Sequence, residues 1–220
     1  MVFLHGYLSS KEAFAGQVEY FSRFYRVTAF DFLGFGGSRC LTNAFSVSDY
    51  AAWMQEVFTL LRIQKPHVIA HSFGCRVAVK AAGADNGAFD KIILTGPAGV
   101  ILKRGFSYHA KVRTYRFVKK FAPKFAERKF GSEEYKTLSP VMKESYKKIV
   151  NEDLRADAAR IGNPVLIVEG TEDKTTPLSE AKAYIDSLPN GRLKLMQGGH
   201  FAFAEHPLIF NLIAEEFLYD

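Results

Sequence analysis

Residues 65–79 read KPHVIAHSFGCRVAV and change character abruptly at Ser72. The apolar run from His67 to Ala70 is short and continuous, as in a buried strand. Beyond Ser72, valines and alanines recur at the spacing of one helix face. The stretch therefore predicts a strand, a tight turn and a helix, with Ser72 at the tip of the turn.

Small residues flank this turn, with Ala70 on one side and Gly74 on the other. They meet the pattern G-x-S-x-G with alanine in place of the first glycine, which keeps a strained turn sterically possible. Ser72 would present its hydroxyl near the first amides of the helix, which favour negative charge. A nucleophilic serine is one interpretation, and a serine that merely caps an ordinary helix is the other.

Apolar runs and helical patterns alternate along the first 99 residues. Such alternation predicts a parallel sheet covered on both faces. One helix should start at Ser46 or Ser48, both suitable capping residues. Strand-like runs occupy 2–4, 25–30, 67–70, 91–95, 164–169 and 192–196, and a last helical pattern covers 208–218.

The alternation breaks between residues 100 and 160, which are rich in Lys, Arg, Tyr and Phe. Their helical patterning predicts a group of helices inserted into the α/β chain. We therefore expect an α/β core formed by residues 1–99 and 161–220, with a helical lid at 100–160.

Composition sets further limits on the class of protein. The chain has 220 residues, of which 48% are apolar and 24% charged, as in soluble globular proteins. The sequence shows no basic leader and no apolar run of about 20 residues, so we expect a cytoplasmic protein. Cys40, Cys75 and the six histidines match no metal-binding spacing, and we expect neither a metal nor another cofactor.

The net charge of +6 is concentrated in one segment. Residues 101–150 contain 14 Lys or Arg and 4 Asp or Glu, a balance of +10, so the rest of the chain carries −4. Such a segment is either a set of solvated helix faces or an attractant for an anionic substrate. No nucleic-acid-binding motif accompanies it, so we expect no nucleic-acid partner. We do not expect a membrane partner either, and a basic lid that lies on an anionic membrane surface is the alternative.

Three chemistry-bearing residues follow predicted strand ends. Ser72, Asp173 and His200 each lie just beyond such an end, and in an open parallel sheet these ends form the ligand-binding edge. A serine hydroxyl needs a base to take its proton, and an imidazole base is oriented by a carboxylate. Glu169 and Glu172 are alternative acids, but the position of Asp173 after the strand favours it.

The tetrahedral intermediate of acyl transfer also needs two amide donors for its oxyanion. The N–H of Phe73, directly after the serine, would be one. The other would come from the turn His5-Gly6-Tyr7, and we assign it to Tyr7.

Together these motifs resemble the α/β-hydrolase superfamily, in the branch with a helical lid. The resemblance covers nearly the whole chain and follows the family's order of Ser, then Asp, then His. The matching motifs are His5-Gly6, Asp31-x-x-Gly34-x-Gly36-x-Ser38, Ala70-His71-Ser72-Phe73-Gly74, Gly170-x-x-Asp173-x-x-x-Pro177 and Gly199-His200-Phe201. Relatives have two more strands before the His-Gly turn, so the resemblance implies a sheet of six parallel strands, in the family order 4-3-5-6-7-8. An exposed edge strand would then allow a homodimer as well as a monomer.

The resemblance implies a serine hydrolase that acts on a small molecule, with a carboxylic ester of small to medium acyl size as the first expectation. Carbon–carbon bond hydrolases, lactonases and aminopeptidases of this fold use similar triads, and a non-catalytic binding protein is a further alternative. The residues expected to contact substrate are His5, Gly6, His71, Phe106, Tyr115 and Phe201. His5 and Asp31 are also candidates for organising loops, and His71 for packing.

Overall fold

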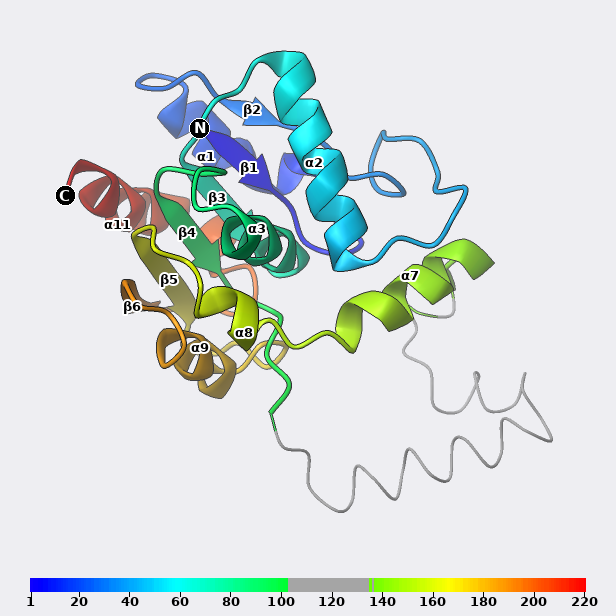
Figure 1. Ribbon diagram of the computed structural model, residues 1–220. Helices are drawn as coiled ribbons and strands as arrows, with labels where there is room; N and C mark the ends of the chain where they lie inside the picture. Colours follow the sequence, from blue (N-terminus) through cyan, green and yellow to red (C-terminus); the bar gives the residue numbers. More distant parts are fainter. Residues whose placement is uncertain (103–134, 136) are drawn as a thin grey trace.

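The computed structural model describes residues 1–102, 135 and 137–220. Its centre is a six-stranded sheet in the order β2-β1-β3-β4-β5-β6, with every neighbouring pair parallel (Figure 1). This is the order predicted from the sequence. The strands are β1 (Val2–Leu4), β2 (Thr28–Ala29), β3 (Val68–His71), β4 (Ile92–Thr95), β5 (Val165–Gly170) and β6 (Gly191–Met196).

The four central strands are short runs of buried apolar residues, as expected for a sheet covered on both faces. Every residue of β1, β3, β4 and β5 is buried. The edge strand β2 has only two residues, whereas the sequence predicted a strand over 25–30. It pairs with β1 at Val2↔Thr28 and Phe3↔Ala29, and β1 has only three residues to offer as partners.

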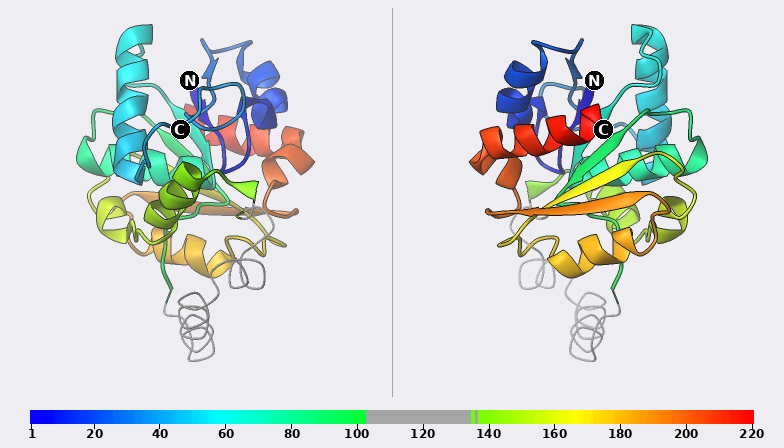
Figure 2. Two further views of the ribbon diagram at one scale, coloured as in Figure 1. Left: turned by 90° about the vertical axis from the view of Figure 1, so that its right-hand side faces the viewer. Right: turned by 90° about the vertical axis from the view of Figure 1, so that its left-hand side faces the viewer.

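Helices cover both faces of the sheet (Figure 2). On one face, α2 (Val47–Leu61), α3 (Phe73–Ala84) and α9 (Leu178–Ile185) pack against alternate strand residues such as Leu4, Ala70 and Ile167. On the other, α1 (Ala15–Phe21), α10 (Ala202–Glu205) and α11 (Pro207–Tyr219) pack against residues such as Phe3 and Ile69. Side chains of successive strand residues point to opposite faces, so each strand contributes to both layers.

Local signals in the sequence set the helix starts. Ser46 caps α2 in a reciprocal box, because its hydroxyl accepts the N–H of Asp49 while the Asp49 carboxylate accepts the N–H of Ser46. This is one of the two capping residues expected from the sequence. A short 3₁₀ helix, η1 (Lys11–Phe14), leads into α1.

Between β4 and β5 the chain leaves the sheet (Figure 1). The described part of this segment contains α7 (Pro140–Val150), capped by Ser139, and the short α8 (Arg155–Ala158). Both helices return the chain toward α3, and α8 packs directly against it. The division into a core and a lid at 100–160 stays a prediction.

Candidate active site

Ser72 lies in a sharp turn between β3 and α3. Its backbone has φ 50° and ψ −105°, a combination that non-glycine residues rarely adopt. Gly74 makes the turn possible, because a Cβ at this position would overlap the carbonyl oxygen of Leu4. The Ser72 N–H donates to the carbonyl of Thr95 at 3.1 Å, which ties the turn to the end of β4.

His200 and Asp173 form a short hydrogen-bonded pair. Nδ1 of His200 lies 2.7 Å from Oδ2 of Asp173. The other carboxylate oxygen accepts the N–H groups of Thr175 at 2.7 Å and Thr176 at 3.0 Å, and the Thr176 hydroxyl donates to Oδ2 at 2.9 Å. Asp173 is thus held in one orientation by four donors.

The electrostatics of this pair keep Asp173 ionised. Burial acts to raise the pKa of Asp173, but the hydrogen bonds from His200 and from the N–H groups of Thr176 and Thr175 outweigh it. Together they lower the pKa to about 2. Of the two alternative acids, Glu172 is exposed, and the oxygens of Glu169 have no hydrogen-bond partner among the described residues.

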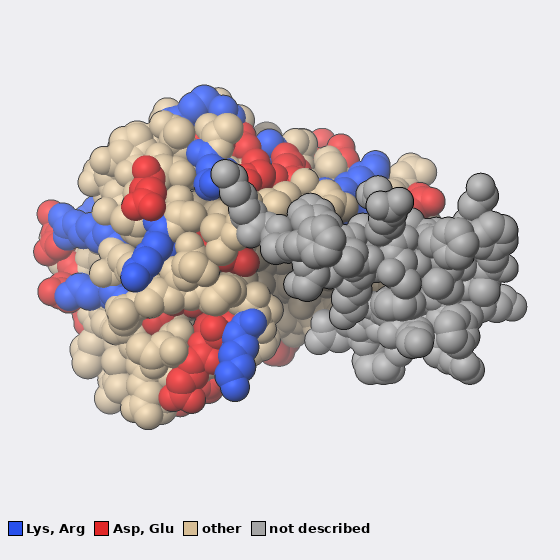
Figure 3. Space-filling view, turned by 90° about the horizontal axis from the view of Figure 1, so that it is seen from below, with Lys and Arg blue, Asp and Glu red and all other residues tan. Residues whose placement is uncertain are grey.

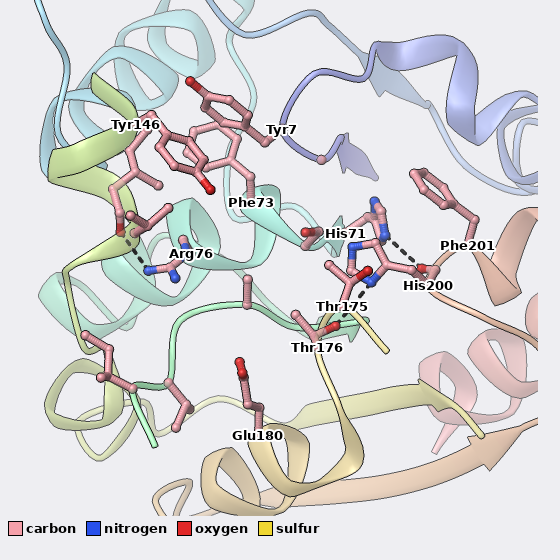
Figure 4. A pocket seen from close by; sticks show the side chains of 17 residues that line it. Tyr7, His71, Phe73, Arg76, Tyr146, Thr175, Thr176, Glu180, His200 and Phe201 are labelled. Atoms are coloured by element: carbon pink, nitrogen blue, oxygen red, sulfur yellow. Dashed lines mark hydrogen bonds between the residues drawn. The ribbon is translucent and has the colours of Figure 1, made fainter. Parts of the chain in front are cut away.

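Ser72 and His200 line one cavity of about 430 Å³, shown from close by in Figure 4. No hydrogen bond joins the Ser72 hydroxyl to another residue in the described part of the chain. The peptide N–H groups of Tyr7 and Phe73 likewise donate to no described residue, although both residues line the cavity. Two amide donors are therefore available beside the serine turn.

His71 forms part of the cavity wall beneath His200. It donates from Nε2 to the carbonyl of His200 at 2.9 Å, and its ring lies 4.7 Å from that of Phe201. Burial and the neighbouring His200 lower the pKa of His71 to about 3, so its ring is neutral. Gly6 also lines the cavity, and a Cβ there would approach Nδ1 of His71 to 2.8 Å.

The structure places His5 differently from the other expected contact residues. His5 is fully buried, accepts the N–H of Phe32 at 3.0 Å and donates to the carbonyl of Gly6 at 2.7 Å. It does not line the cavity, so its position is that of a residue that organises the loop. Asp31 likewise accepts the N–H groups of Lys11 and Gly37. Phe106 and Tyr115 lie outside the described residues.

Sequence reasoning did not identify several residues of this cavity. Arg76 lies one helical turn after Ser72, and its charge is a signal that could have marked it, because Lys80 is the one other charged residue of this helix. Thr175 and Thr176 come two and three residues after Asp173, where the N–H groups that complete an Asx turn lie. The wall residues that were not predicted are Arg76, Ala98, Val100, Ile101, Tyr146, Ile149, Val150, Thr175, Thr176 and Glu180.

The described ranges contain no group of three or more His, Cys, Asp or Glu residues arranged to hold a metal ion. Cys75 is fully buried, and burial raises the pKa of its thiol. Within the same ranges, no helix has the length and apolar character that crossing a membrane requires.

Residues 1–211 match the model of the "Alpha/beta hydrolase family". The chain is 26% identical over 219 residues to 2-hydroxymuconate semialdehyde hydrolase of Pseudomonas putida, with 88% of this chain and 76% of the relative covered. Its fold is similar to that of an esterase from Exiguobacterium antarcticum, with a TM-score of 0.77, 21% identity and coverage of 100% and 91%. It also resembles the enol-lactonase from Burkholderia xenovorans, with a TM-score of 0.77, 20% identity and coverage of 100% and 90%. The chain belongs to the alpha/beta hydrolase family.

Proposed function

We propose that this protein is a serine hydrolase that works through an acyl-enzyme on Ser72. The observation that carries the proposal is the 2.7 Å pair of His200 and Asp173, because His200 lines the same cavity as Ser72, a serine with a strained backbone. Strain of this kind costs roughly 1–3 kcal/mol and persists where the surrounding structure enforces it.

In the proposed reaction, Nε2 of His200 takes the proton of Ser72 as the hydroxyl attacks the substrate carbonyl. The imidazolium that forms donates from Nδ1 to Asp173, whose low pKa keeps it negatively charged. The same imidazolium then gives its proton to the leaving group, and water hydrolyses the acyl-enzyme by the reverse sequence.

The N–H groups of Tyr7 and Phe73 would bind the oxyanion. Both are free of other described acceptors, and Phe73 is the first residue of α3, where the helix dipole adds positive potential. By analogy with measured deletions, each such donor contributes roughly 3–4 kcal/mol to stabilising the transition state.

We propose a carboxylic ester of small to medium acyl size as the substrate, and a monomer or homodimer as the active form. A cavity of about 430 Å³ suits a compact small molecule, and the similar esterase fold supports the choice. The matched hydrolase of Pseudomonas putida favours a second candidate, the hydrolysis of a carbon–carbon bond in an acidic semialdehyde.

A fluorophosphonate probe tests the nucleophile, and 4-nitrophenyl esters of rising chain length test the reaction. We expect the wild-type protein to be labelled at Ser72 and to turn over the short esters. Ser72→Ala should abolish both, whereas Ser48→Ala, at an exposed serine of α2, should abolish neither. Labelling without ester turnover would favour carbon–carbon cleavage, and the absence of both would support a non-catalytic binding protein.

A further inference from the structure

Arg76 is a buried cation in the wall of the cavity. It belongs to the first turn of α3, four residues after Ser72, and is only 8% exposed. Figure 4 shows its guanidinium at the cavity, on the side opposite His200. The proposed reaction uses neither this side chain nor its charge.

The hydrogen bonds of Arg76 leave much of its guanidinium unused. Nη1 donates to the carbonyl of Ile149 at 2.8 Å and to that of Glu152 at 3.0 Å. Nε and Nη2 donate to no described residue. Neither is one of the fully buried polar atoms without a partner, so both remain accessible from the cavity that Arg76 lines. None of the ion pairs among the described residues includes Arg76.

Arg76 has no carboxylate in direct contact. The charges of Glu180 and Glu152 act on it, but neither forms an ion pair with it, and Glu152 pairs with Lys80 instead. A guanidinium stays protonated in proteins, and burying its charge is costly unless a counter-charge pairs with it. The carbonyls of Ile149 and Glu152 satisfy one nitrogen but bring no full negative charge. Burial accordingly lowers the pKa of Arg76. The free edge of the fork, Nε with Nη2, has the geometry that binds a carboxylate through two parallel hydrogen bonds.

The position of Arg76 also indicates which part of a substrate it would meet. The leaving group departs beside His200, which protonates it. Arg76 lies across the cavity from His200 and one helical turn, about 5 Å along the axis, from Ser72. The acyl part of a substrate bound at Ser72 would therefore extend toward Arg76.

We infer that Arg76 binds a carboxylate on the acyl part of the substrate, so that the preferred substrates are half-esters of short dicarboxylic acids or close analogues. This inference rests on the proposed function, since it assumes that Ser72 attacks the substrate. Glu180 lines the same cavity, and its negative charge acts against an anionic ligand. Its removal should therefore strengthen the preference.

A pair of esters that differ mainly in charge provides the test. We would compare kcat/KM for mono-4-nitrophenyl glutarate and 4-nitrophenyl butyrate in the wild type and in Arg76→Gln, Arg76→Lys and Glu180→Gln. The wild type should prefer the anionic ester. Arg76→Gln should lower the ratio of the two values at least tenfold, Arg76→Lys should restore part of it, and Glu180→Gln should raise it about two- to fivefold. An arginine that only ties α3 to the α7–α8 connection would affect both esters equally, and an unchanged ratio in both Arg76 variants would refute the inference.

Binding without turnover separates this inference from the proposed function. In the Ser72→Ala protein, monomethyl glutarate should raise the thermal midpoint and the uncharged dimethyl glutarate should not. The added Arg76→Lys change, which keeps the charge and supports folding, should reduce this shift by more than half. If no ester is hydrolysed but this pattern holds, the anion site stands and the reaction is wrong. If monomethyl glutarate and dimethyl glutarate shift the thermal midpoint equally, the proposed anion site is wrong, even if the wild-type protein hydrolyses esters.

Discussion

Replacing Glu169 by glutamine should make the stability of this protein less dependent on pH. Glu169 belongs to β5 and is completely buried, and neither of its carboxyl oxygens has a hydrogen-bond partner among the described residues. Burial, reinforced by the negative charge of Asp173, raises the pKa of Glu169 to about 8. The side chain is therefore protonated in the folded protein at neutral pH.

The sign of the effect follows from comparing proton binding in the two states. Above a pH of about 4.5 the unfolded chain loses the Glu169 proton, whereas the folded chain keeps it up to about 8. Folding then requires proton uptake, so the unfolding free energy of the wild type falls by up to about 1.4 kcal/mol per pH unit in this window. Structural relaxation and water penetration reduce such effects. We expect about half this slope, or roughly 2 kcal/mol in total.

Urea unfolding of wild type and Glu169→Gln between pH 5 and 9 measures this difference. The variant should gain stability relative to wild type as the pH rises to about 8, with no further gain above it. Glu172→Gln is the matched control, because Glu172 follows the same strand but is exposed, and it should not reproduce the gain of Glu169→Gln. A constant offset between Glu169→Gln and wild type across the range would show that Glu169 is not held protonated.

Three further substitutions test the turn and the acid. Gly74→Ala should lose at least about 3 kcal/mol of unfolding free energy, because the new methyl group overlaps the carbonyl oxygen of Leu4. Gly162→Ala, at an exposed glycine where a Cβ would make only an ordinary contact with Asn86, should lose less than about 1 kcal/mol in the same urea titration. Asp173→Asn should lower kcat for 4-nitrophenyl butyrate about 10³- to 10⁴-fold by removing the carboxylate that stabilises the imidazolium, and a loss below tenfold would exclude this role. Ser72→Gly should have an unfolding free energy about 1 kcal/mol higher than that of Ser72→Ala, since glycine relieves the strained φ of 50°. Equal urea midpoints for the two variants would show that the turn is unstrained.

The fold was largely readable from the sequence because its signals are local. Apolar runs of strand length, separated by helical periodicity, predicted the six strands, and the resemblance to the α/β-hydrolase superfamily implied their order. The predicted length of β2 was wrong, because the length of a strand also depends on its partner in the sheet. Residues 25–30 have the composition of a strand, but only Thr28 and Ala29 pair with β1, which itself has three residues. Composition sets where a strand can form, and its neighbour sets how far it extends.

In the candidate site too, residues marked by local signals were predictable and residues placed by distant contacts were not. The convergence of Ser72, Asp173 and His200 follows from the rule that parallel strands end at one edge, and the structure places the three at that edge. The buried position of His5 does not follow from this rule. It depends on a hydrogen bond from the N–H of Phe32, which is 27 residues away in the sequence. Arg76 was missed because its burial depends on carbonyls of Ile149 and Glu152, more than 70 residues later.

Several features that cost stability gather at this one edge of the sheet. Ser72 has a strained backbone, and Nδ1 of His71 is buried without a described partner. Glu169 is a buried acid without one, and Arg76 is a buried cation that forms no ion pair with a described residue. Packing alone does not require such a set. Single buried polar atoms without a described partner also occur elsewhere, in His67, Asn163 and Asn211, but most of the core is apolar. Proteins keep destabilising groups together where function needs them. Ser72 and Arg76 have such roles under the proposals made above, so substitutions that relieve their costs should stabilise the fold and impair the enzyme together. Glu169 has no role in the proposed reaction, and Glu169→Gln should therefore gain stability while keeping ester turnover.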